Sequence, residues 1–401
     1  MTEVFNGSFT QQEPIPDEGI AAANAVMRHG RLHRYNTVAG EVAEVALLEE
    51  EFADSVGAKY CLAVASGGYA LSTALRACGV GHGDNVLTNT FTLAPVPGAI
   101  ASVGGVPVFV GVTDDLVIDL DDLAEKLPQA KVLLLSHMRG HICDMVRLMA
   151  LCDAAGVVVI EDCAHTMGAS WDGVPSGRWG RFGCYSTQTY KHINSGEGGL
   201  LISDDADSMA RAIMLSGSYM LFDRHRAAPA PEVFAQIKYD TPNISGRMDN
   251  LRAAILRPQL RNLSEQAKKW NARYYAVEEG LMETPGLRLI QRPVNEQFVA
   301  SSFQFLLLDW TAEAVKEVIS RCAQRGVELK WFGAAEPDGF TSRYDSWKYA
   351  PSNPMPASDR ILAGIVDMRL PLTFSLDDCA LIARIIRAEV GAVFQAQSAP
   401  S

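Results

Sequence analysis

The hydrophobic pattern between about residues 58 and 205 alternates short apolar runs with amphipathic stretches. Such continuous short runs are typical of strands covered on both faces. We predict strands over residues 60–65, 106–110, 132–135, 157–160, 182–187 and 200–203. We predict helices over residues 70–78 and 144–155, the second ending at Gly156. This alternation indicates an α/β domain, with a mostly parallel sheet and helices on both faces.

The pattern changes near residue 242, where longer helical stretches take over. We predict further helices over residues 251–263, 265–281, 311–325 and 376–393, and strands over 303–308 and 327–330. Residues 333–358 are rich in Pro, Gly, Ser and Asp and predict a long loop, which is more often functional than inert. We expect two domains: a large α/β domain over residues 1–260, with an N-terminal arm, and a smaller α+β domain over 261–401.

The composition narrows the class of protein. Hydrophobic residues make up 48% and charged residues 20% of the 401 residues, as in a globular protein. The formal net charge of −12 argues against nucleic-acid binding, which depends on neutralising phosphates with basic side chains. A small anion held by a few backbone amides is still compatible with this charge.

The eight cysteines contain no Cys-x-x-Cys pair, and several lie in apolar stretches. Such scattered thiols indicate a reducing compartment rather than a disulfide framework. The polar, acidic N-terminal stretch resembles no signal or transit peptide, and no apolar run reaches the roughly 18 residues of a membrane span. We therefore expect a cytoplasmic protein without a membrane partner.

Three segments that could carry chemistry follow predicted strands, at the edge where open α/β sheets bind ligands. The turn Ser66-Gly67-Gly68-Tyr69 precedes a helix and could bring backbone amides to a phosphate, although such turns often only redirect the chain. Glu161-Asp162 ends a strand, where Asp162 could bind a cationic heterocycle or simply cap the next segment. Lys191 precedes a glycine-rich loop, although an isolated lysine is usually solvated.

Together these three segments hold the parts that a pyridoxal phosphate enzyme requires. Lysine forms a Schiff base with the aldehyde of this cofactor. A carboxylate keeps the pyridine nitrogen protonated, so that the ring can accept electrons, and a separate site anchors the phosphate. Lys191, Asp162 and the turn at Gly67-Gly68 are our candidates for these roles.

Several motifs along the chain resemble the DegT/DnrJ/EryC1/StrS family of sugar aminotransferases, which are fold-type-I pyridoxal phosphate enzymes. The most discriminating is Lys191 followed by Gly196-Glu197-Gly198-Gly199. The other matching stretches are 48–67, Gly83-Asp84, 104–109, 137–140, 161–165, Arg247-Met248, Ala253-Ala254 and Gln259-Leu260. The resemblance implies that the predicted α/β domain has the fold of this enzyme class.

The resemblance also implies roles for single residues. Lys191 matches the Schiff-base lysine and proton shuttle, and Asp162 matches the partner of the pyridine nitrogen. Ser186 matches a phosphate-binding hydroxyl, and His165 stands where the family usually has Gln near the ring hydroxyl. These four residues and the turn of Gly67, Gly68 and Tyr69 form most of the expected cofactor site.

Three positions depart from the family pattern. The usual Gly-Thr of the phosphate turn has Gly68 in place of Thr, so that a hydroxyl is missing. Leu93 falls where the family has an aromatic residue that stacks on the ring, with Phe91 as the alternative. An Asn that reaches the phosphate of a neighbouring subunit is replaced by Ser245, with Asn243 two residues earlier, which leaves that contact open.

We expect no metal site. His137 and His141 are four residues apart, a spacing that could hold zinc on a helix. They flank Arg139-Gly140 directly after a predicted strand, and no acidic third ligand has a suitable spacing.

The resemblance implies a homodimeric aminotransferase that transfers an amino group from a small-molecule donor, glutamate or glutamine, to a keto-sugar or similar polyhydroxylated carbonyl acceptor. Lys191 separates the chain from the dehydratase members, which carry His there. Residues 33–36, His-Arg-Tyr-Asn, resemble the Arg-Tyr-Asn of members that aminate octulosonate-type sugars. Two alternatives stay open: an enzyme of this fold with a non-sugar substrate, and a non-catalytic regulator that binds pyridoxal phosphate.

Overall fold

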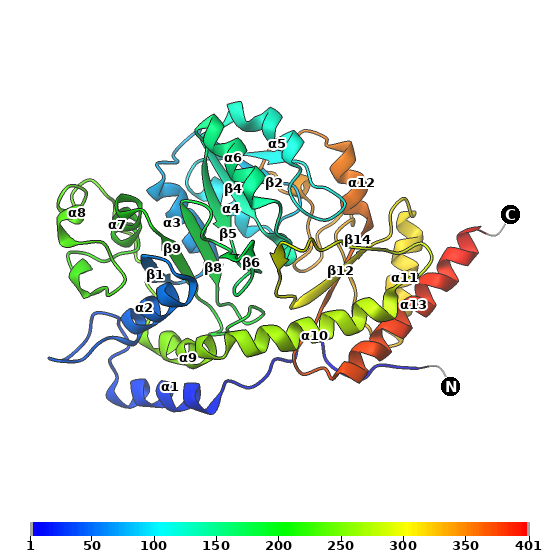
Figure 1. Cartoon of the computed structure of the whole chain (residues 1–401), viewed down its shortest axis with the longest axis horizontal. Coiled ribbons are helices and arrows are strands. Elements are labelled where there is room, and N and C mark those ends of the chain that lie inside the picture. Colours follow the sequence, from blue (N-terminus) through cyan, green and yellow to red (C-terminus); the bar gives the residue numbers. More distant parts are fainter. Residues whose placement is uncertain (1–2, 399–401) are drawn as a thin grey trace.

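A seven-stranded sheet forms the centre of the larger part of the molecule in the computed structural model, which describes residues 3–398 (Figure 1). Its strands in spatial order are β1 (Tyr60–Val64), β9 (Gly199–Ser203), β8 (Phe182–Ser186), β5 (Val158–Asp162), β4 (Val132–Ser136), β2 (Asn85–Asn89) and β3 (Val106–Val110). Neighbours from β8 to β3 are parallel, whereas β9 runs antiparallel to both β1 and β8. The predicted mostly parallel α/β sheet is therefore confirmed.

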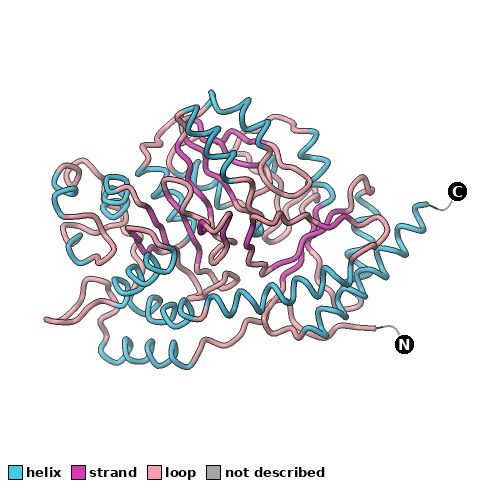
Figure 2. Tube along the Cα trace, viewed as in Figure 1, coloured by secondary structure: helices cyan, strands magenta, loops and turns pink. Residues whose placement is uncertain are grey.

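Helices cover both faces of this sheet (Figure 2). One face packs against α3 (Gly67–Ala77), α4 (Pro95–Ser102) and α7 (Ala206–Leu215). The other packs against α5 (Leu120–Lys126) and α6 (Met145–Ala155) at one side, and α2 (Glu44–Val56) and α9 (Asn250–Arg261) at the other. The short helix α8 (Pro231–Ala235) packs near α7. This double covering explains why the strands are apolar throughout rather than alternating.

The C-terminal part is built on an antiparallel sheet of β10 (Arg288–Leu289), β12 (Ser302–Leu306), β14 (Ile365–Arg369) and β13 (Lys330–Trp331). Its helices are α10 (Leu263–Leu281), α11 (Ala312–Gln324), α12 (Pro356–Gly364) and α13 (Leu376–Ser398). A small sheet joins β6 (Ser170–Trp171), β7 (Val174–Pro175) and β11 (Glu296–Gln297). The single-turn helices are η1 (Leu127–Gln129), η2 (Met138–Gly140), η3 (Phe222–Arg224) and η4 (Tyr344–Ser346).

The predicted large domain, residues 1–260, includes the N-terminal segment. In the structure this segment packs against both parts of the molecule. Phe5 and Phe9 are buried in the core of the C-terminal part, where their rings contact Phe374 edge to face. Helix α1 (Asp17–His29) then packs along α9 of the larger part. The division at residue 260 stays a prediction, because α10 also contributes to the cores of both parts.

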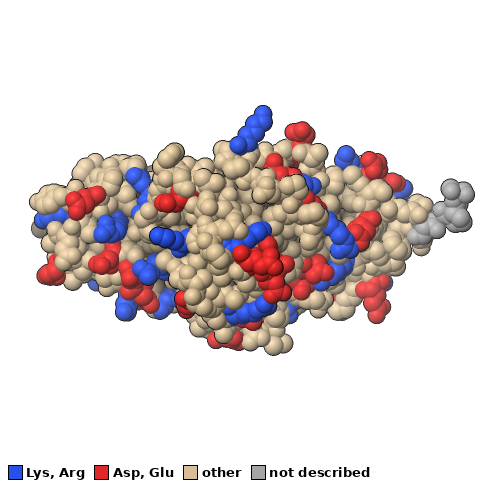
Figure 3. Space-filling model, turned by 90° about the horizontal axis from the view of Figure 1, so that it is seen from above, with Lys and Arg blue, Asp and Glu red and all other residues tan. Residues whose placement is uncertain are grey.

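All eight cysteines have free thiols, and seven of them are buried. Among the described residues, no helix combines the length and the apolar character that crossing a bilayer would demand. Basic and acidic side chains are interspersed on the face shown in Figure 3, so that no extended basic surface is visible there.

Candidate active site

The predicted functional residues meet at one edge of the central sheet. Asp162 is the last residue of β5, Ser186 is the last residue of β8, and Lys191 lies in the loop that follows β8. Gly67 begins the helix that follows β1. Because β1 runs in the same direction as β5 and β8, all these strands end at the same edge, and the residues line one cavity of about 440 Å³.

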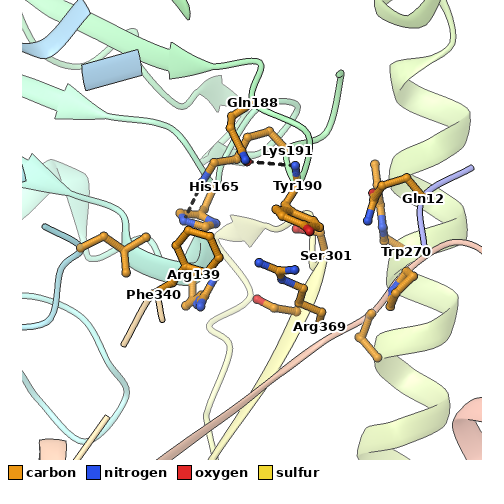
Figure 4. Close-up of a pocket in the computed structure, with 14 residues that line it drawn as sticks. Gln12, Arg139, His165, Gln188, Tyr190, Lys191, Trp270, Ser301, Phe340 and Arg369 are labelled. Carbon is orange, nitrogen blue, oxygen red and sulfur yellow. Dashed lines mark hydrogen bonds between the residues drawn. The ribbon is translucent and has the colours of Figure 1, made fainter. Parts of the chain in front are cut away.

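The amine of Lys191 faces this cavity from a largely buried position. Its Nζ lies 3.0 Å from His165 Nε2 (Figure 4). Burial and the nearby guanidinium of Arg139 lower the pKa of Lys191 to about 7. Burial and the charge of Lys191 also hold the pKa of His165 well below its usual value. The amine is therefore partly neutral near pH 7, as a nucleophile and proton carrier requires.

The carboxylate of Asp162 is buried at the end of β5. Its Oδ1 accepts the N–H of Ala164 at 3.1 Å, and its Oδ2 accepts the hydroxyl of Ser136 at 3.4 Å. Burial raises the pKa of Asp162, while the charge of Lys191 opposes this rise. A buried carboxylate is stabilised by a cation, and a protonated heterocycle in the cavity would supply one.

The glycine turn forms a narrow cradle at the other end of the cavity. Ser66 caps α3 by accepting the N–H of Tyr69 at 3.1 Å, and the amides of Gly67 and Gly68 have no carbonyl partner within the helix because they begin it. A Cβ on Gly67 would lie 2.8 Å from the Cβ of Ser186. Free amides, a serine hydroxyl and a helix N-terminus together suit a phosphate group.

These residues fit pyridoxal phosphate. The cavity size lies within the usual range for cofactor sites, and one cavity holds a buried amine, a buried carboxylate and an amide cradle. The amine would hold the aldehyde carbon, the carboxylate would face the pyridine nitrogen, and the cradle would receive the phosphate.

The comparisons with known proteins decide the family. The profile of the DegT/DnrJ/EryC1/StrS aminotransferase family matches residues 15–387. The chain belongs to this family. Its members use pyridoxal phosphate as their cofactor. The fold-type-I assignment predicted from the resemblance is confirmed.

The similar proteins support the same family. An L-glutamine:2-deoxy-scyllo-inosose aminotransferase from Streptomyces fradiae is 32% identical over 279 residues, which are 69% of this chain and 65% of that protein. A UDP-2-acetamido-2-deoxy-3-oxo-D-glucuronate aminotransferase from Pseudomonas aeruginosa is 32% identical over 260 residues, which are 64% of this chain and 67% of that protein. The chain thus spans about two thirds of the length of each.

The solved structures agree in fold. The aminotransferase TlmJ from Streptoalloteichus hindustanus superposes with a TM-score of 0.80 at 24% identity, covering 97% of this chain and 99% of its own. An aminotransferase from Psychrobacter cryohalolentis superposes with a TM-score of 0.78 at 21% identity, covering 96% and 100%.

The lowered pKa of Lys191 leads to a prediction about cofactor capture. Only the neutral amine attacks the aldehyde, so the rate at which cofactor-free protein captures pyridoxal phosphate should rise with pH through about 7 and level off above it. Stopped-flow absorbance at a series of pH values measures this rate. A rate that keeps rising toward the ordinary lysine pKa of 10.5 would contradict the prediction.

Two adjacent glycines offer a matched test of the phosphate cradle. Gly67→Ala should cost about 1–3 kcal/mol of stability and weaken cofactor binding, because its Cβ would press on Ser186. Gly68→Ala should be tolerated, since its Cβ would meet only Pro95 Cβ at 3.9 Å. Titration of the two cofactor-free variants with pyridoxal phosphate compares them, and equal affinities would argue against the cradle.

Of the remaining residues considered as cofactor contacts, Leu93 lines the cavity, whereas Phe91 and Tyr69 do not. Leu93 lines the cavity beside Lys191, whereas Phe91 is 1% exposed and packs edge to face on Phe332. Leu93 is therefore the better placed of the two to contact a ring. Tyr69 lies outside the lining, because its hydroxyl donates to the carbonyls of Leu215 and Ile244. A cofactor contact through Tyr69 stays a prediction.

Sequence reasoning missed several residues that surround Lys191. Arg139, Tyr190, Trp270 and Arg369 line the adjoining part of the pocket (Figure 4). One signal was available for Arg139: it lies inside the matching stretch 137–140, next to a glycine. Its backbone adopts φ 56°, a left-handed conformation that is uncommon outside glycine and often marks a functional site.

The possible metal ligands form a different group from the one considered in the sequence. Ligand atoms of His137, Glu161 and Cys163 lie within 4.8 Å of one another. The two carboxylate oxygens of Glu161 already accept three backbone N–H groups from residues 177–180, and Oε2 lies 3.0 Å from His137 Nε2. His141 instead pairs with a side chain on β12. Glu161 therefore acts as a structural acceptor that organises the 177–180 turn.

Proposed function

We propose that this protein is a pyridoxal phosphate-dependent aminotransferase that moves an amino group from glutamate or glutamine to a keto-sugar or similar polyhydroxylated carbonyl compound. The observation that carries the proposal is the buried, partly neutral amine of Lys191 in one cavity with a buried carboxylate and an amide cradle. A regulator that only binds the cofactor would not require a lysine poised to exchange protons.

The residues divide the work of the proposed reaction. Pyridoxal phosphate, when bound, supplies an aldehyde that can hold the amino group and a ring that withdraws electrons. Lys191 would remove the proton from the carbon that bears the donor amine and would deliver it to the carbon that receives the amino group. Asp162 would keep the ring nitrogen protonated, and the Gly67 cradle with Ser186 would fix the phosphate so that the reacting atoms stay beside Lys191.

The proposed acceptor class is supported by two features. The similar proteins named above act on keto-inositols or nucleotide-linked keto-sugars by their names. The pocket around Lys191 also presents several hydrogen-bonding side chains, including Gln12, Gln188, Ser301 and Ser302. Such groups suit a substrate with many hydroxyls better than a hydrocarbon chain.

The test follows the cofactor through both halves of the reaction. Glutamate or glutamine added to the loaded protein should remove its visible absorbance, and a polyhydroxylated ketone such as 2-deoxy-scyllo-inosose should restore it while the corresponding amine forms. If the protein binds the cofactor but no amine donor changes its absorbance, the result would support the regulator instead. Recovery by simple keto acids alone would favour a non-sugar substrate.

We further propose that the protein is a homodimer. Large apolar side chains stay exposed around residues 219–244, with Tyr239 80%, Tyr219 53%, Met220 51% and Ile244 44% exposed. Asn243 and Ser245 are exposed in the same segment, where a neighbouring subunit could meet them. Light scattering measures the mass, and a monomer at all working concentrations would contradict this proposal.

The free thiols are the basis for our remaining proposal of a reducing, cytoplasmic location.

A further inference from the structure

An arginine without an acidic partner faces the pocket that contains Lys191. Arg369 ends β14, and its guanidinium carbon lies 3.5 Å from the centre of the Tyr190 ring and 5.5 Å from that of Phe340 (Figure 4). Within residues 3–398, its side chain makes no ion pair. The planar guanidinium of Arg369 therefore lies over the Tyr190 ring, and no acidic side chain among the described residues neutralises its charge.

The other arginine of the pocket provides a contrast. Arg139 lies 2.8 Å from Asp367, which shares a face of β14 with Arg369 because the two are separated by one residue. Asp367 in turn accepts the amide of Gln304 at 2.7 Å, and Gln304 is paired with His141 at 2.9 Å. This fixed network neutralises Arg139 and leaves Asp367 committed to it.

The position of Arg369 relative to the reactive amine is also fixed. Tyr190, on which the guanidinium rests, is the residue directly before Lys191. Arg369 comes from the C-terminal sheet, whereas Lys191 comes from the edge of the central sheet. A ligand in this pocket would therefore present its reacting carbon to one part of the chain and an anionic group to the other.

We propose that Arg369 is a carboxylate anchor that selects substrates with an acidic group near the reacting carbon. The proposal rests on the proposed aminotransferase function. A guanidinium binds a carboxylate through two parallel hydrogen bonds, and these charge-assisted bonds are among the strongest in proteins. The carboxylate could belong to the amino donor or to the carbonyl acceptor, since both occupy the same pocket in turn.

The experiment compares probes that differ only by an acidic group. On the donor side the acidic probe is L-glutamine and the neutral probe is 4-aminobutanamide, which lacks only its carboxylate. On the acceptor side the acidic probe is 3-oxo-glucuronate and the neutral probe is 3-oxo-glucose, both without a nucleotide. Calorimetry with glutarate, which cannot react, reports binding directly. The loaded proteins are the natural sequence, Arg369→Gln, Arg369→Lys and the control Arg360→Gln, an exposed arginine paired with Asp309 away from the pocket.

Arg369→Gln should raise the half-saturating concentration of the acidic probe by roughly 10- to 100-fold, with the neutral probe unchanged. A response to glutamine alone assigns the anchor to the donor, and a response to the oxo-glucuronate alone assigns it to the acceptor. Glutarate binding should weaken in parallel. Arg369→Lys should recover part of the affinity, because it keeps the charge but not the fork, and Arg360→Gln should match the natural protein.

Two results would overturn the anchor. One is an equal response of acidic and neutral probes, and the other is loss of bound cofactor in both Arg369 variants, which would give Arg369 a role in holding the cofactor or the fold. Failure of the proposed function is a separate result. In that case the natural protein would transfer an amino group from none of the amines tested, while glutarate calorimetry would still report on Arg369.

Discussion

Replacing Lys191 with alanine is expected to stop amino transfer while leaving the fold intact. Proton transfer by a positioned side chain contributes about 10²–10⁴-fold to rates, and the same amine also holds the cofactor, so the combined loss should reach the detection limit. The side chain lines a cavity, and within the described residues its Nζ forms a hydrogen bond only with His165, so its removal should cost little stability. Turnover with glutamine and the visible absorbance of the loaded protein measure the effect.

Two further variants make this expectation specific. Lys131→Ala removes an exposed lysine far along the chain and should leave turnover unchanged. Lys191→Arg keeps a cation in the pocket, but a guanidinium cannot become neutral near pH 7, so turnover should stay lost. An Ala variant that still transferred amino groups would mean that another group performs the proton transfer.

Removing the buried Arg34 is expected to destabilise the protein by about 3–5 kcal/mol, because it leaves an uncompensated charge on Glu49. Arg34 donates to both carboxylate oxygens of Glu49, at 2.9 and 2.8 Å, and the two residues are 3% and 0% exposed. Glu49 also accepts the N–H of Ala63 on β1, and His225 Nδ1 lies 3.2 Å from it. The pair therefore ties the N-terminal segment to α2 and the central sheet.

The matched control is Arg226→Ala. Arg226 pairs with Glu50 at 2.7 Å, but both side chains are more than a third exposed, so the loss should stay below about 1 kcal/mol. Denaturant unfolding gives both free energies. If Arg34→Ala unfolded at the same denaturant concentration as Arg226→Ala, the buried pair would not contribute as expected.

The same pair predicts how stability depends on pH. Burial opposes ionisation of Glu49, but Arg34 and His225 outweigh it and lower the pKa of this carboxyl to about 2. A depressed pKa stabilises the folded state above the ordinary value of 4.5, and this contribution should fade as the pH drops from there through about 2. Unfolding curves at several acidic pH values should show a shallower decline in the Arg34→Ala variant.

The fold could be predicted where strands are uninterrupted apolar runs, but two five-residue strands and the two-residue strands β6, β7, β10 and β11 escaped this criterion. Strand β2 begins and ends with Asn, and only Val86 and Leu87 in it are apolar. Strand β14 contains Asp367 and Arg369, and charged residues at alternate positions usually indicate a solvent-facing strand. Here that face lies against the active-site pocket, so the same residues that hide the strand in the sequence give the pocket its charge.

The candidate site could be predicted only as far as local sequence carries chemistry. Asp162 ends its strand, and Gly67 and Lys191 lie shortly after theirs; because these strands run in the same direction, the three residues meet at one edge and line one cavity. Arg369 comes from a separate sheet, and its approach to Tyr190 depends on how the two parts pack. The segment 33–36 shows the converse, since its Arg34 looked like part of a substrate signature and is buried in a structural ion pair.

The place of Phe5 and Phe9 in the C-terminal core has a consequence for the order in which the chain is made. These aromatic residues leave the ribosome well before the residues that cover them, from Phe303 to Ile386. Domains generally fold as they emerge, N-terminal parts first. The central sheet can therefore assemble early, whereas this apolar segment stays exposed until residues 303–386 have emerged. A bulky insertion shortly before Phe5 would interfere with this late packing step, and its effect should appear as reduced soluble yield.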